Sequence, residues 1–393
     1  MAAIRRTGYV WDESFAWHNT GNTAAIWPPS PVVQPIEAFE NPATKARLAS
    51  LVEVSRLGAE LIRRPTRLAT EEELLRVHEG AYLQRLERES NHTGGEGGDG
   101  ETIFGVGSYE IARRAAGSLI DLTDAVLSGE LDNGYALVRP PGHHAEPDRG
   151  RGYCLLANVP IAIEHARQVR GVERVAIVDY DVHHGNGAER IYWSDGGVLT
   201  ISIHQDQLFP ENSGEITKTG EGDGAGTNIN IPLPAGSGHE AYFETFKQVV
   251  YPALKRFQPD LIMVSSGFDP SMLDPLGCMS VTSDGFRELA RMLVEWADEL
   301  CDGRLVFSHE GGYSAVYVPF CGLAVMEEIS GHRTAIDDPF APGWANNPVH
   351  KLRADQLEVI QQAAELAAAV PERSNAGSFS SSGNGGGAGN GSS

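Results

Sequence analysis

The stretch Val175-Ala-Ile-Val-Asp-Tyr-Asp-Val-His-His-Gly-Asn-Gly187 begins as an apolar, β-branched run and ends in polar residues. The apolar part predicts a buried strand. Side chains alternate between the two faces of a strand, so Asp179, Asp181 and His183 share one side. Asp181 and His183 are spaced to reach one metal ion together, and Asp179 lies one step deeper, where it can orient another group. Taken alone, such a pattern is most often a strand that ends in a charged loop, so its interpretation depends on the other strands.

The rest of the chain alternates between strand-like and helix-like segments. Strands are expected at residues 8–11, 135–138, 175–179, 198–203, 228–231, 261–265 and 305–308. Helices are expected to begin near Asn41, Thr70, Ser108, Pro160, Glu240, Ser283 and Ala315. This order predicts an α/β fold with a central, mostly parallel sheet flanked by helices. In such sheets, ligands bind beyond the carboxyl ends of the strands.

Composition and charge argue against several classes of protein. Of the 393 residues, 41% are apolar and 21% are charged, which is typical of a soluble globular protein. No stretch approaches the roughly 18 apolar residues of a membrane span, and the first residues lack the apolar segment of a secretory signal, so we expect a cytoplasmic protein. The net charge of −22 argues against a nucleic-acid-binding surface and mildly favours cationic substrates.

The domain organisation is predicted to be simple. No repeat or linker-like change in composition interrupts residues 1–370, so we expect one catalytic domain there. Residues 371–393 are mostly Gly, Ser and Asn, and we expect this tail to be disordered because it cannot bury apolar surface. The stretch 19–35 predicts a long loop, a candidate for packing between subunits of a homo-oligomer. The four cysteines form no C-x-x-C pair, which argues for free thiols.

Polar residues follow four of the expected strands. The four strand ends lead into Arg139-Pro-Pro-Gly-His-His144, into Asp181 and His183, into Ser266-Gly-Phe-Asp269, and into His309-Glu-Gly-Gly-Tyr313. Each segment alone fits an ordinary turn or loop. Because the carboxyl ends of parallel strands meet at one edge of a sheet, the four together predict one cleft.

Three of these residues form a candidate metal site. Asp181, His183 and Asp269 offer two carboxylates and one imidazole. Three protein ligands and an open position are typical of a catalytic zinc site, whereas structural zinc sites are closed by a fourth ligand. A metal held there would lower the pKa of a water molecule and polarise a carbonyl group.

The other polar residues supply acid, base and hydrogen-bonding groups. His143 and His144 ionise near neutral pH and can act as general base and general acid. Tyr313 can donate a hydrogen bond to a developing oxyanion. Asp179 and Asn186 are candidates to orient the two histidines. This set of groups predicts the hydrolysis of an amide.

The combined motifs resemble the zinc-dependent histone deacetylase family, within the arginase/deacetylase superfamily. The resemblance is carried by Pro-Gly-His143-His144, Asp179 to Gly187, Ser-Gly-Phe-Asp269 and Glu310-Gly-Gly-Tyr313, and it extends from Gly8 to about Gly331. It looks closest to bacterial class II deacetylase-like amidohydrolases, alongside acetylpolyamine amidohydrolases, because Asn186 stands where class I members carry Asp. It implies a three-layer arginase/deacetylase-like fold and one zinc ion per chain. The partner of His144 would be the neutral Asn186. This leaves open which of His143 and His144 acts as the acid and which as the base.

The resemblance also implies residues around the substrate and two further ions. Tyr153, which stands where the family usually has Phe, and Phe209 would wall the acyl channel. A structural potassium ion is implied at Asp179, Ser202 and Ile203 with the backbone of Asp181 and His183, and a second at Tyr192, Asp195, Val198 and Thr227. Separately, Asp99 and Glu101 in the glycine-rich loop 91–107 are candidates to contact a substrate.

We therefore expect a zinc-dependent amidohydrolase that removes acetyl or another short acyl group from an acyl-lysine or a small-molecule amide. His144 would take the proton of water, His143 would neutralise charge and protonate the leaving amine, and Tyr313 would stabilise the oxyanion. Acetylpolyamines and xenobiotic amides fit the same residues. An arginase-like ureohydrolase with two manganese ions is less favoured, because His184 and Asn186 add no carboxylate. A non-catalytic acyl-lysine binding module is also less favoured, because all three ligands and the tyrosine are present.

Overall fold

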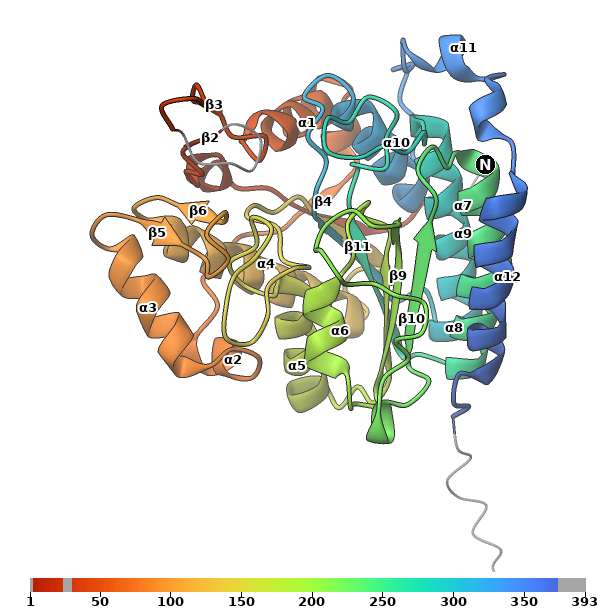
Figure 1. The fold of residues 1–393 in the computed structure, drawn as a ribbon, viewed down its shortest axis with the longest axis horizontal. Helices are drawn as coiled ribbons and strands as arrows, with labels where there is room; N and C mark the ends of the chain where they lie inside the picture. The colour runs from red at the N-terminus through yellow and green to blue at the C-terminus, as the bar shows by residue number, and fades with distance from the viewer. Residues whose placement is uncertain (1–2, 24–29, 374–393) are drawn as a thin grey trace, which may run out of the picture.

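An eight-stranded sheet lies at the centre of the computed structural model, which describes residues 3–23 and 30–373 (Figure 1). Its strands are β1 (Thr7–Val10), β4 (Ile62–Arg63), β7 (Asn133–Ala136), β8 (Val175–Asp179), β9 (Val198–Gln205), β10 (Asn228–Leu233), β11 (Leu261–Ser266) and β12 (Leu305–His309). They follow the order β10-β9-β8-β11-β12-β7-β1-β4, and every neighbouring pair runs parallel. The parallel sheet predicted from the sequence is confirmed.

Helices and two short antiparallel ribbons complete the fold. The helices are α1 (Ala43–Val54), α2 (Glu71–Leu75), α3 (Gly80–Ser90), α4 (Ser108–Leu127), α5 (Asn158–Arg170), α6 (Asn186–Tyr192), α7 (His239–Thr245), α8 (Tyr251–Phe257), α9 (Ser283–Cys301), α10 (Val318–Ser330), α11 (Ala341–Trp344) and α12 (Ala354–Ala369). The ribbons pair β2 (Asn22–Thr23) with β3 (Ile36–Glu37), and β5 (Gly95–Glu96) with β6 (Ile103–Phe104).

Helices pack on both faces of the sheet and produce three layers. Figure 1 shows α4, α5 and α6 on one side and α7, α8, α9 and α12 on the other. In β8, Val175 and Ile177 belong to the apolar core that includes α4 and α5, whereas Ala176 and Val178 belong to the core that includes α8, α9 and α12. A strand covered on both faces needs an unbroken apolar run, which explains the sequence of β8.

Local sequence signals fix several helix starts. Thr70 caps α2: its hydroxyl accepts the backbone N–H of Glu73, and the Glu73 carboxylate accepts the N–H of Thr70, as the sequence predicts. Some boundaries differ from expectation. β7 starts and ends two residues earlier than expected, because its pairing with β1 and β12 extends from Asn133 to Ala136. Residues 315–317 form a turn, so α10 begins only at Val318. The helices α3, α6, α11 and α12 and the strand β4 were not predicted.

The strands β8 and β11 are neighbours at the point where the strand order reverses. From β8 the chain continues to β9 and β10 on one side, then returns to β11 and continues to β12 on the other side. The connections that leave the carboxyl ends of β8 and β11 therefore diverge and leave a crevice, the usual ligand site in such sheets. Asp181 and His183 follow β8, and Asp269 follows β11.

Two sequence expectations lie partly outside the described residues: positions 24–29 of the loop 19–35, and positions 374–393 of the tail. The last described helix, α12, ends at Ala369, one residue before the boundary expected at 370. In the described ranges, no helix combines the length and the apolar character needed to cross a membrane.

Candidate active site

The three predicted metal ligands meet in the crevice between β8 and β11. Asp181, His183 and Asp269 are buried, and their potential ligand atoms all lie within 4.8 Å of one another. His183 Nδ1 is 3.0 Å from Asp181 Oδ1 and 3.1 Å from Asp269 Oδ2. The structure therefore brings together one imidazole nitrogen and two carboxylate oxygens from segments almost ninety residues apart.

Backbone groups hold the other carboxylate oxygens. The N–H of Gly311 donates to Asp181 Oδ2 at 2.8 Å, and the N–H of Val182 donates to Asp269 Oδ1 at 2.8 Å. Burial and the adjacent Asp181 carboxylate raise the pKa of the Asp269 carboxyl. Two buried carboxylates that both approach one imidazole nitrogen repel each other unless a cation or a proton lies between them. The donor set thus fits a divalent metal ion.

Gly311 makes room for both carboxylates. A Cβ at this position would lie 2.1 Å from Asp269 Oδ2 and 2.7 Å from Asp181 Oδ2. We expect Gly311→Ala to weaken metal affinity by about 10- to 100-fold, because it displaces ligands without removing one. Competition with a chelator, followed by elemental analysis, measures this loss. Gly343→Ala, where a Cβ meets no atom within 4 Å, is the matched control and should bind metal like the parent. Equal affinity of the two variants would contradict the prediction.

His143 and His144 form a pair beside this cluster, with ring centroids 3.8 Å apart. His143 Nδ1 lies 3.0 Å from Asp179 Oδ2, and His144 Nδ1 lies 2.7 Å from Asn186 Oδ1. Asn186 also donates from its side-chain amide to the carbonyl of His144 at 3.3 Å. The carboxylate of Asp179 can therefore orient the ring of His143, and the neutral amide of Asn186 can orient the ring of His144.

The two histidines have opposite pKa shifts. Burial acts to lower the pKa of His143, but the carboxylates of Asp181 and Asp179 outweigh it and raise the pKa to about 10. Burial, together with the nearby His143 and His183, holds the pKa of His144 well below its usual value. This arrangement favours an imidazolium at His143 and a neutral imidazole at His144. Only the neutral ring can accept a proton.

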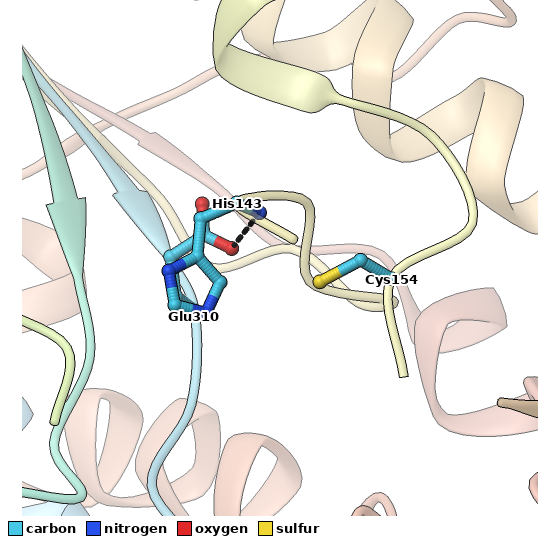
Figure 2. Close-up of side chains that lie close together, drawn as sticks. All are labelled: His143, Cys154 and Glu310. Atoms are coloured by element: carbon cyan, nitrogen blue, oxygen red, sulfur yellow. Dashed lines mark hydrogen bonds between the residues drawn. The ribbon is translucent and has the colours of Figure 1, made fainter. Parts of the chain in front are cut away.

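A buried glutamate anchors the turn that carries the histidine pair. Figure 2 shows the Glu310 carboxylate beside the backbone of His143, with Cys154 nearby. Glu310 Oε2 accepts the N–H groups of Gly142 and His143 at 2.6 and 3.1 Å. One potential ligand atom from each of His143, Cys154 and Glu310 also lies within 4.8 Å of the other two. Burial raises the pKa of the Cys154 thiol well above its usual value, so the sulfur stays protonated and the group is better explained as support for His143.

A pocket lies beside the metal ligands, and one of them, His183, lines it. Its lining includes the functional residues His144, His183 and Tyr313, the expected wall residues Tyr153 and Phe209, the expected substrate-contact candidate Glu101, and four residues without a sequence prediction of this kind: Thr102, Gly152, Leu208 and Leu276. Tyr313 lies across from Tyr153, with ring centroids 5.9 Å apart, and 6.4 Å from the ring of His183. The pocket is therefore an aromatic-walled channel that reaches one of the metal ligands, His183.

Asp99 is not among the lining residues. Its carboxylate accepts the N–H groups of Glu101 and Thr102, the Thr102 hydroxyl and the N–H of Gly152. These contacts join the glycine-rich loop to the channel wall at Gly152, whose φ of +53° suits glycine. Glu101, two residues later, is the acidic residue of this loop that lines the channel.

The residues of the two expected potassium sites lie in two groups. Asp179 and Ser202 are register partners in β8 and β9, next to Ile203. Thr227 donates from its hydroxyl to the carbonyls of Gly224 and Asp195, and the N–H of Asp195 donates to the carbonyl of Tyr192. The N–H of Val198 also donates to the carbonyl of Asp195, at 3.5 Å.

Comparisons with known proteins agree in the family that they indicate. A family model described as the histone deacetylase domain matches residues 39–329, a range that includes every strand-end residue named above. A histone deacetylase-like amidohydrolase of Pseudomonas aeruginosa is 50% identical over 338 residues, which cover 85% of this chain and 89% of that protein. A probable deacetylase of Archaeoglobus fulgidus is 39% identical over 275 residues, covering 69% and 75% of the two chains. The crystal structure of the HDA15 HD domain superimposes with a TM-score of 0.79 at 28% identity, over 92% of this chain and 93% of that chain.

Proposed function

The chain belongs to the histone deacetylase family and is a deacetylase-like amidohydrolase, and from this premise we propose that it uses one zinc ion to remove acetyl or another short acyl group from an amine. Asp181, His183 and Asp269 would hold the zinc. The observation that carries the proposal is the convergence of their ligand atoms beside the channel that His183, His144 and Tyr313 line. Zinc bound there would supply a Lewis acid that polarises the acyl carbonyl and acidifies a water molecule.

The protein's own groups would carry the remaining steps. The aromatic walls at Tyr153 and Phe209 hold the acyl chain and exclude bulk water. His144, neutral and oriented by Asn186, accepts the proton of the attacking water. His143, charged beside Asp179, neutralises developing charge and donates a proton to the leaving amine. Tyr313 donates from its hydroxyl to the carbonyl oxygen as that oxygen becomes negative.

The substrate class in this proposal is an acyl-lysine or a similar small amide. Glu101 lines the channel and adds a negative charge to its wall, which would favour substrates that carry a cationic group besides the uncharged amide. Acetylpolyamines and xenobiotic amides are the alternatives on the same site. An arginase-like reaction needs a second metal ion and has less support. His184 Nδ1 contacts the hydroxyl of Ser213, and Asn186 Oδ1 contacts His144 Nδ1, so both side chains already have protein partners. We also propose structural potassium ions at the two groups of residues described above, where they would stabilise β8 and β9.

A substrate panel tests the proposal. We expect the zinc-loaded protein to hydrolyse a fluorogenic acetyl-lysine peptide with kcat/KM at least about tenfold above that for acetylated polyamines and simple anilides. Comparing the three kcat/KM values under one set of conditions is the measurement. Faster turnover of an acetylpolyamine would favour the alternative substrate class. No amide hydrolysis by zinc-loaded, folded protein would contradict the proposed function.

A further inference from the structure

Asp274 is an acidic residue of the channel region that has no role in the chemistry described above. It lies in the loop that follows β11, five residues after Asp269. Asp274 Oδ2 accepts the N–H of Tyr313 at 2.7 Å, and Asp274 Oδ1 accepts the N–H of Leu276 at 2.9 Å. Tyr313 and Leu276 both line the channel. One carboxylate therefore joins two walls of the channel through their backbones.

Tyr313 has few other polar constraints. In the described part of the chain, the bond to Asp274 is the hydrogen bond that the structure assigns to Tyr313. Its ring has aromatic and cationic neighbours, with Tyr153 at 5.9 Å and the Lys45 ammonium at 5.7 Å from its centroid.

The backbone before Tyr313 contains two glycines. Tyr313 follows Gly311 and Gly312, and Gly312 has a φ of +116°. The N–H of Gly311 is fixed by Asp181, and its carbonyl accepts the N–H of Phe268. Beyond Gly312, the next anchor along the chain is the bond from Tyr313 to Asp274. Only Gly312 lies between these anchors, and its backbone freedom allows the tyrosine to rotate away from the metal ligands when the second anchor is lost.

We propose that Asp274 is a positioning residue that holds Tyr313 over the metal ligands and ties it to the channel wall at Leu276. The inference rests on the proposed role of the Tyr313 hydroxyl. It assigns Asp274 no contact with substrate. A displacement of about 1 Å in a group that stabilises the transition state lowers the rate by about 100-fold, so the anchor affects kcat more than KM.

A double-mutant cycle tests this inference on the full-length, zinc-loaded protein. The four proteins are the parent, Asp274→Ala, Tyr313→Phe and the double variant, each assayed with a fluorogenic acetyl-lysine peptide. We expect Asp274→Ala to lower kcat by about 10- to 100-fold in the parent, and by less than about threefold when it is combined with Tyr313→Phe. Zinc content should equal that of the parent. Asp274→Asn, which keeps one acceptor oxygen, should lie between the parent and Asp274→Ala.

A matched aspartate outside the channel provides the control. Asp338 also accepts a backbone N–H and a second donor, from Phe340 and Ser283, but it lies away from the channel lining. Asp338→Ala should leave kcat within about twofold of the parent. If Asp274→Ala does not fold, Asp274→Asn in both backgrounds gives the same comparison with a smaller perturbation.

Two outcomes would overturn the inference, and they are distinguishable from failure of the proposed function. Equal losses from Asp274→Ala in the parent and in the Tyr313→Phe variant would mean that Asp274 does not act through the hydroxyl. A loss of zinc in Asp274→Ala would assign the effect to the metal site. By contrast, full activity of Tyr313→Phe alone would remove the proposed role of Tyr313 itself, and the inference with it.

Discussion

Substituting Asp269 by Ala is expected to lower kcat/KM by about 1,000- to 10,000-fold, because it removes one of three metal ligands. A catalytic metal contributes several kcal/mol of transition-state stabilisation, and about 1.4 kcal/mol corresponds to a factor of ten in rate. The remaining carboxylate, Asp181, is buried and would keep His183 as the second of two metal ligands. The measurement is kcat/KM together with bound metal per chain, and both should fall.

The matched control for this variant is Asp298→Ala. Asp298 forms an ion pair with Arg5 at 2.6 Å on the surface, with nearly half of its side chain exposed. Ion pairs of this kind contribute little, so activity and metal content should stay within about twofold of the parent. The prediction fails if Asp269→Ala retains metal and activity within about tenfold of this control.

The second large effect is expected for His144→Ala, which should lower kcat by about 100- to 10,000-fold while leaving metal content unchanged. His144 is the neutral member of the histidine pair and lines the channel, so its loss removes the group that accepts the proton of water. It donates no atom to the three-ligand cluster, and this separates its effect from that of Asp269→Ala.

His92→Ala is the control for this second prediction, because His92 is exposed and lies two residues after the end of α3, outside the channel lining. It should match the parent in kcat and in metal content. A His144→Ala variant with near-parental kcat would assign the proton transfer to another group, and a variant that has lost its metal would show that His144 supports the cluster.

Local sequence patterns predicted the parts of this site that depend on strand ends. The apolar run 175–178 predicts a strand covered on both faces, and the polar residues after it must then lie at the carboxyl edge of the sheet. The same reasoning holds for Asp269 after β11 and for Tyr313 after β12. These positions follow from periodicity and chain direction alone, so the cluster of Asp181, His183 and Asp269 was predictable without coordinates.

Contacts that depend on how loops approach one another were not predictable in this way. Asp99 and Glu101 lie in one glycine-rich loop, and the sequence does not distinguish the carboxylate that bonds to its own loop from the one that lines the channel. Glu310 and Asp274 accept backbone N–H groups from distant segments, and any residue can supply such a donor. The sequence therefore carries no pattern that marks these two carboxylates as supports for His143 and Tyr313.

The central claim is that a single metal ion, held by Asp181, His183 and Asp269, is needed for amide hydrolysis. Its most direct test is to remove all metal from the protein with a chelator and then to titrate zinc back while measuring hydrolysis of a fluorogenic acetyl-lysine peptide. We expect no activity in the metal-free protein and a linear recovery that reaches its plateau at one zinc ion per chain. Full activity in the metal-free protein, or a plateau only at two ions per chain, would contradict the account.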